Sequence, residues 1–179
     1  RFHRGYHYPR SSKTIREIKE SYSAFIKFYG KNVLKNTHNY YAISKKGSKI
    51  TFEEYLKILK KNKLPYKKII NQNYVSNKIS GIIQSNEKII NYFKIKKKIK
   101  ILISKNKNLK LVLSAKINKT LLKTFDKVFI VTYQNNNEIL KKLDLKLTKK
   151  YKFELIEKIV VKLERKFHNK SFVVADGKF

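Results

Sequence analysis

The chain has 179 residues, in which 44 Lys and Arg stand against 12 Asp and Glu, for a formal net charge of +32 at pH 7. Hydrophobic residues make up 41%, with 12 Tyr and 11 Phe, which excludes a wholly disordered tail and predicts a folded core. The absence of Cys excludes a disulfide framework and a thiolate metal site. Charged residues interrupt every apolar run, so no membrane-spanning segment is expected.

Residues 1–13 hold no acid and almost no aliphatic side chain, so we expect an extended basic-aromatic arm that builds no core. Arginine binds phosphate and stacks on bases, and aromatic rings stack on bases too. The alternative is an unstructured remnant of a targeting peptide. The candidate RNA-binding residues of this arm are Arg1, Arg4, Tyr6, His7, Tyr8, Arg10 and Lys13.

Residues 14–93 are expected to be mostly helical. Thr14 and Glu17 fit a capping box, and an apolar stripe at helical spacing runs from Ile15 to Tyr29. A polar loop is expected to follow to about residue 50, with Lys45, Lys46 and Lys49 as further RNA-binding candidates.

A second capping box at Thr51 and Glu54 predicts a short helix that ends before Leu64-Pro65. Residues 66–93 are expected to be helical in pieces, although their many isoleucines suit strands equally well.

Residues 94–179 are expected to form a mixed α/β region with the order β-β-α-β-α-α-β. Alternating apolar residues predict a hairpin over 99–113, followed by a helix at 117–125 and a strand at 128–133. Helices are expected from Glu138 to Leu147 and over 150–167, before a strand at 172–175. The fold class is therefore α+β or α/β, with a boundary near 93–98 or a single compact domain that includes 14–93.

The segment from Lys88 through Phe125 holds no acidic residue. Its lysines gather on the predicted hairpin, where they can contact RNA phosphates or, alternatively, protect an exposed strand edge from aggregation. The acids instead gather in the last third of the chain, where they favour protein neighbours or ordinary pairing of helix residues four apart, such as Glu138 with Lys142 and Glu154 with Lys158. The RNA-binding candidates of the hairpin are Lys96, Lys97, Lys98, Lys100, Lys105, Lys107 and Lys110.

No motif of the chain indicates catalysis. Nucleophile elbows, metalloprotease helices and glycine-rich phosphate loops are all lacking, and His3 and His7 have no accompanying ligands. We therefore expect no enzyme, no cofactor, no metal and no small-molecule substrate.

The shortage of acids indicates a polyanionic partner, because a compact protein of this charge repels itself. The hypothesis is a structural protein of an organellar ribosome in the mitochondrial matrix, or alternatively the plastid, with rRNA and neighbouring ribosomal proteins as partners. An organellar DNA-binding nucleoid protein is the alternative, and an RNA-processing enzyme is less favoured. The start at Arg1 without any Met favours a cleaved import presequence, or else a leading segment left out of the sequence.

Overall fold

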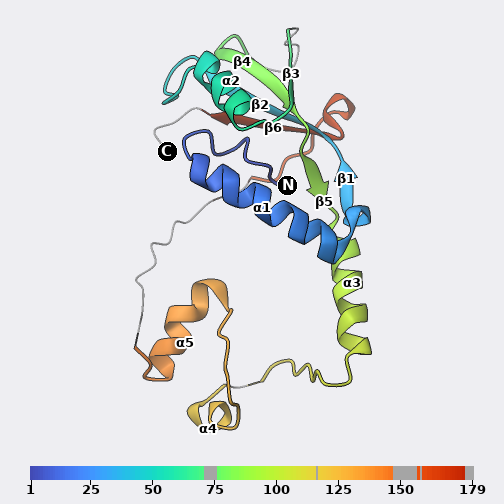
Figure 1. Ribbon diagram of the computed structural model, residues 1–179, viewed down its shortest axis with the longest axis vertical. Coiled ribbons are helices and arrows are strands. Elements are labelled where there is room, and N and C mark those ends of the chain that lie inside the picture. The colour runs from blue at the N-terminus through green and yellow to red at the C-terminus, as the bar shows by residue number, and fades with distance from the viewer. Residues whose placement is uncertain (71–75, 116, 147–156, 158, 176–179) are drawn as a thin grey trace. The chain divides into compact units, whose positions relative to one another are not determined.

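The computed structural model describes residues 1–70, 76–115, 117–146, 157 and 159–175, and it has the mixed α+β character predicted from the sequence. The chain divides into two compact units. Unit 1 consists of residues 1–106 and 163–179, and unit 2 consists of residues 107–162. Figure 1 shows the helices and strands of each.

Unit 1 is built on a four-stranded sheet in the order β3-β4-β2-β6. The inner strand β2 (His38–Ser44) pairs antiparallel with β4 (Ile79–Ser85) and parallel with β6 (Lys170–Ala175), and β3 (Tyr66–Lys68) lies antiparallel on the far side of β4. A second ladder joins β1 (Leu34–Asn36) to β5 (Lys88–Ile90). Strands from both chain segments of unit 1 therefore pair with β2.

The main core lies on the face of the sheet that α2 (Phe52–Lys61) covers. Tyr55 and Leu59 of α2 are buried there together with residues of β2 and β4. The predicted capping box is confirmed, because Thr51 and Glu54 bond each other's backbone N–H groups. Gly81 of β4 leaves room for the Phe52 ring, since a Cβ at this position would lie 2.2 Å from a ring carbon.

The opposite face of the sheet holds a smaller cluster. Tyr40 of β2 stacks on Phe172 of β6, with ring centroids 4.9 Å apart. Tyr40, Ala42, Ile79 and Ile82 are buried in this cluster. Both faces of β2 are therefore covered, and its residues 39–43 are buried without alternation.

The N-terminal residues pack on the fold, so the expectation that they build no core is wrong. Tyr6 is 1% exposed and belongs to the main core. Phe2 stacks on Tyr22 of α1 (Ser12–Tyr29) at 4.6 Å between centroids. The helix is the predicted one, but its N-cap is Ser11, whose side chain accepts the Thr14 N–H, rather than the predicted Thr14.

Two expectations for the middle of unit 1 are also wrong. The polar loop expected over 31–50 contains a short 3-10 helix, η1 (Lys31–Val33), together with β1 and β2. The region 66–93, expected to be helical in pieces, contributes β3, β4 and β5. The isoleucines of this region lie mostly in strands, as β-branched side chains favour.

The predicted hairpin over 99–113 is wrong as well, because α3 (Tyr92–Lys105) occupies its first half. Asn91 caps this helix by accepting the Lys94 N–H. Ile95, Ile99 and Leu102 recur at spacings of four and three, which places them on one helical face. Residues 109–113 contain no strand.

In the described part of unit 2, α4 (Lys119–Leu122) lies within the helix predicted over 117–125. The helix predicted from Glu138 overlaps α5 (Asn136–Lys142), which begins two residues earlier. The strand expected at 128–133 is wrong, since this stretch is irregular and is followed by the 3-10 helix η2 (Tyr133–Asn135). The helix expected over 150–167 falls partly outside the described residues, which lack 150–156 and 158. Of its described part, residues 159–164 are not helical, and 165–167 form the 3-10 helix η3 (Arg165–Phe167). The final predicted strand is confirmed as β6.

Candidate nucleic-acid interface

The first two arginines of the chain hold the N-terminal segment onto the sheet. The Arg1 guanidinium lies 5.1 Å from the centroid of the Tyr41 ring and donates to Ser171 Oγ of β6. The Arg4 backbone N–H donates to Glu87 Oε1 at 2.7 Å, and its side chain donates to Asn86 Oδ1 at 2.5 Å. Both side chains thus form intramolecular bonds that compete with any contact to RNA.

Glu87 is the carboxylate on which this segment is anchored. It is 2% exposed, and its Oε2 accepts the Tyr41 hydroxyl at 2.5 Å. His3 Nδ1 lies 3.7 Å from its Oε1. Burial raises the pKa of Glu87, but the nearby His3 imidazole and the hydrogen bonds from the Tyr41 hydroxyl and the Arg4 backbone outweigh burial and lower the pKa overall. Glu87 is therefore a buried anion at neutral pH.

A cavity of about 420 Å³ lies beside this anchor, between residues 6–10, 41–43, 48–50 and 173–175. Tyr6, Tyr41 and Tyr55 line its buried floor. Their hydroxyls are all engaged within the protein: Tyr6 donates to the Pro65 carbonyl at 2.5 Å, Tyr55 donates to the Tyr6 carbonyl at 3.0 Å, and Tyr41 donates to Glu87. These three side chains therefore close the floor and leave no tyrosine hydroxyl free for a ligand.

The rim of this cavity is basic and aromatic. Arg10 and Lys49 are exposed there, and neither has an ion-pair partner among the residues the structure describes. Tyr8 is 38% exposed and makes an edge contact with the His7 ring at 5.2 Å between centroids. Partial burial, together with His3 and Arg1, lowers the pKa of His7, so the positive charge of the rim at pH 7 comes from Arg10 and Lys49. The fold thus brings Tyr6, His7, Tyr8 and Arg10 together with Lys49, which is far away in the sequence.

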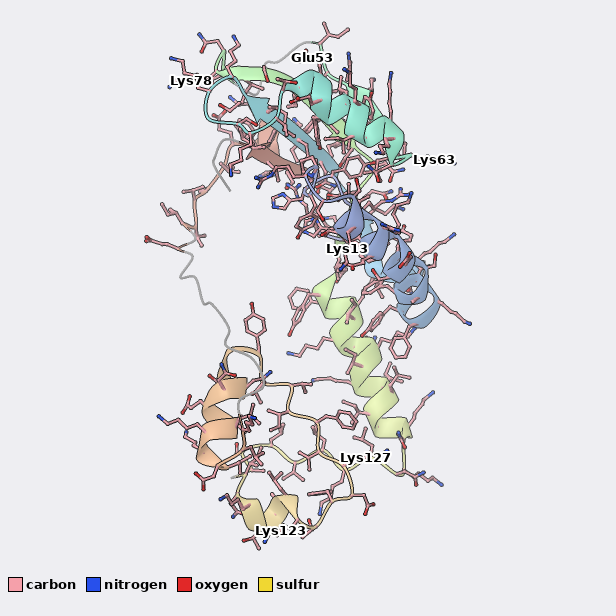
Figure 2. The ribbon with its side chains drawn as sticks, turned by 60° about the vertical axis from the view of Figure 1, so that its left-hand side comes forward. Lys13, Glu53, Lys63, Lys78, Lys123 and Lys127 are labelled. Carbon is pink, nitrogen blue, oxygen red and sulfur yellow. The ribbon has the colours of Figure 1, made fainter. Side chains whose placement is uncertain are left out.

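Lys45 and Lys46, the two other predicted lysines of the β2–α2 loop, are exposed and come shortly before Lys49 in the sequence. The Lys45 N–H donates to the Lys78 carbonyl at 2.8 Å, which brings the loop to the start of β4. Figure 2 shows Lys78 near the beginning of α2, where Glu53 lies, and Lys63 near its end. Lys13 is exposed on the first turn of α1 and lies 4.0 Å from Glu17.

The remaining predicted lysines of unit 1 lie on α3. This helix carries six lysines and no acid, and none of its residues is buried. Lys98 Nζ donates to the Phe28 carbonyl at 2.8 Å, and Lys96 Nζ lies 5.9 Å from the centroid of the Tyr92 ring. The lysines without an ion-pair partner in the described part of the chain are Lys94, Lys96, Lys97, Lys98, Lys100 and Lys105.

Lys107 and Lys110 are exposed on the coil that follows α3, and they belong to unit 2. The acids described in unit 2 are partly neutralised by its own lysines. Lys119 Nζ lies 2.5 Å from Asp144 Oδ2, and Lys142 Nζ lies 2.6 Å from Glu138 Oε1. The second of these pairs is the one predicted from residues four apart on a helix, whereas the predicted pairing of Glu154 lies outside the described residues.

Sequence reasoning missed Tyr41 and Ser48 as cavity residues because residues 31–50 were taken for a loop. It also missed Tyr55, which lies in the predicted helix after Thr51, and the anchor Glu87, which lies in the region expected to be helical in pieces. The uninterrupted Tyr-Tyr-Ala-Ile run at 40–43 is the signal that could have revealed a buried strand.

In the described ranges, no three or more His, Cys, Asp or Glu side chains form a group that could hold a metal ion. Among the same residues, no helix combines the length and the apolarity needed to cross a membrane. The chain matches no protein-family model, no curated protein and no solved structure.

Proposed function

We propose that this protein is a structural constituent of an organellar ribosome, in the mitochondrion or alternatively the plastid, and that it binds rRNA through contacts to the phosphate backbone. Its lysines would neutralise converging phosphates, and its folded units would pack between rRNA and neighbouring ribosomal proteins. Phosphate contacts of this kind position a protein on RNA without reading the sequence of its bases.

The observation that carries this proposal is α3. Lys94 and Lys97, like Lys97 and Lys100, are three residues apart, so their ammonium groups are neighbours on the helix surface and repel each other. The helix contributes no buried residue that would offset this repulsion. A row of phosphates along α3 would remove the repulsion and release counterions into solution.

The acids of unit 1 do not neutralise this charge. Glu87 is buried in the anchor of the N-terminal segment, and Glu54 is held by the Thr51 backbone in the capping box. Glu17 lies beside Lys13 on α1. These carboxylates therefore leave the lysines of α3 and of the β2–α2 loop to an external anion.

The proposal is tested by measuring the affinity of the purified protein for a folded rRNA fragment over a range of salt concentrations. We expect a log–log slope of about −5 or steeper, because each phosphate contact releases counterions. Changing Lys97, Lys100 and Lys105 together to Gln should make the slope shallower by roughly 2. A slope near −1 in the unmodified protein would contradict the proposal.

The matched control changes Lys119, Lys142 and Lys166 to Gln, because each of these lysines already has a carboxylate partner within the protein. This variant loses the same charge, so an equal change of slope would show a diffuse charge effect rather than contacts along α3. Duplex DNA bound as tightly as rRNA would instead favour the nucleoid alternative. Sedimentation of organelle extracts with and without ribonuclease tests for membership of a large ribonucleoprotein particle.

A further inference from the structure

We propose that the cavity between residues 6–10 and the β2–α2 loop is a nucleotide-binding pocket, which stacks one unpaired base on Tyr8, above a floor of buried tyrosines, and holds the attached phosphate with Arg10 and Lys49. This inference deepens the proposed function, on which it rests, because it adds one base contact to binding that otherwise involves the backbone. The shared ligand chemistry is an aromatic base joined to a phosphate, from an RNA strand or from a free nucleotide.

Tyr8 provides the stacking surface of the cavity. It keeps 38% of its surface exposed, so one face of a base can stack on its ring. The Tyr6 and Tyr41 rings stack on each other with centroids 5.8 Å apart, and both side chains are almost fully buried, so they close the floor of the cavity. Their hydroxyls bond to the protein and leave no polar group of these two side chains for a ligand to satisfy.

The cations are placed where the attached phosphate would lie. Arg10 ends the N-terminal wall, and Lys49 stands on the loop wall of the same cavity. Arg1 and Arg4 of the same segment are engaged by Ser171 and Asn86, whereas Arg10 has no such bond among the described residues. The guanidinium can form two parallel bonds to a phosphate, and the ammonium adds a point charge.

The combination of these two features selects a nucleotide over simpler ligands. A lone phosphate would not use the apolar floor, and an apolar side chain would not use the two cations at the rim. The cavity volume of about 420 Å³ falls in the range of roughly 300–1,000 Å³ found for small-molecule pockets, so one nucleotide is of suitable size. Stacking on aromatic residues is also the usual way in which proteins hold unpaired RNA bases.

The test compares two single-stranded RNA oligomers of equal length, one with all its bases and one abasic, at a salt concentration that screens most of the phosphate attraction. We expect the base-bearing oligomer to bind about tenfold more tightly, as stacking of one base provides. Tyr8→Ala should remove this difference, and the exposed Tyr133→Ala in unit 2 should preserve it. Arg10→Ala should weaken binding of both oligomers more than Arg16→Ala, its control on α1.

A third arm uses adenosine monophosphate alone, to separate a free nucleotide from an RNA strand as the natural source. The pocket is supported if the mononucleotide displaces the labelled oligomer from the unmodified protein and fails to do so in the Tyr8→Ala variant. If base-bearing and abasic oligomers bind equally with a steep salt slope, the pocket proposal is overturned while the proposed RNA-binding function stands. If no oligomer binds but the mononucleotide does so through Tyr8 and Arg10, the proposed function fails and the pocket stands.

Photocrosslinking of the unmodified protein keeps the test independent of variant folding. An oligomer with one 4-thiouridine should crosslink within residues 6–10, 41–43 or 48–50, as mapped by mass spectrometry. Crosslinks found only outside these segments would overturn the pocket.

Discussion

Replacing Glu87 with Gln should destabilise the protein by about 2 kcal/mol. The carboxylate accepts two strong hydrogen bonds, from the Tyr41 hydroxyl at 2.5 Å and from the Arg4 backbone N–H at 2.7 Å. A hydrogen bond to a charged group contributes about 1 kcal/mol more than a neutral one, and two such bonds are affected. Gln would also point a donor at one of the two groups that now donate to Glu87.

The effect should depend on pH in a defined direction. The pKa of Glu87 in the folded protein lies below the ordinary value of 4.5 that applies in the unfolded chain. The stabilisation by the carboxylate is therefore complete above pH 4.5 and is lost as the pH falls through the lower folded pKa. The difference in unfolding free energy between the native protein and Glu87→Gln should consequently shrink in acid, because a protonated Glu resembles Gln.

Urea unfolding followed by circular dichroism at several pH values measures this difference. The matched control is Glu53→Gln on the exposed face of α2, which should change the unfolding free energy by less than about 0.5 kcal/mol. An equal effect of both substitutions at neutral pH, or a difference that persists in strong acid, would refute the reasoning that Glu87 acts as a buried anion.

Three further substitutions test the packing of unit 1 by thermal or urea unfolding. Tyr6→Ala should lower the free energy of unfolding by about 3 kcal/mol or more, since it leaves a cavity in the core and an unpaired Pro65 carbonyl. A decrease below about 1 kcal/mol would show that the N-terminal segment is a separate arm. Gly81→Ala should lower the free energy of unfolding by about 2 kcal/mol, because the new Cβ would overlap the Phe52 ring. An unchanged free energy of unfolding would mean that the ring moves freely. Thr51→Ala should cost about 1 kcal/mol through loss of the capping box, and an unchanged midpoint would contradict that role.

The parts of the fold that could be predicted are those with clear local signals. The helix α2 has both a capping box at Thr51 and an apolar stripe that includes Tyr55 and Leu59, and the structure contains both. The strand β6 was predicted from the compact apolar run Phe172–Ala175. Local signals suffice here because the same residues determine both the backbone conformation and the buried face.

Other elements failed because one pattern fits two structures. Ile99, Ile101 and Ile103 alternate with other residues as in a strand, yet Ile95, Ile99 and Leu102 also form a helical stripe, and the helix is what the structure contains. In β2 the burial of both faces removes the alternation that reveals a strand. Which pattern prevails depends on partners far away in the sequence.

The sequence pointed to some of the residues that line the candidate site but not to its geometry. Composition singled out the basic and aromatic residues 1–13, and Tyr8 and Arg10 do lie at the rim of the cavity. The floor could not be predicted, because Tyr41 and Tyr55 reach it only through the pairing of β2 and the packing of α2. Such long-range contacts leave no mark on the local sequence.

The position of β6 also determines the order in which the nascent chain can complete its sheet. β6 pairs in parallel with β2, and all of unit 2 is translated between the two strands. Until Lys170–Ala175 has left the exit tunnel, one edge of β2 has no neighbour, and an open edge recruits strands from other molecules. This edge of β2 therefore stays open from the pairing of β2 with β4 until β6 emerges, a period that includes the translation of all of unit 2.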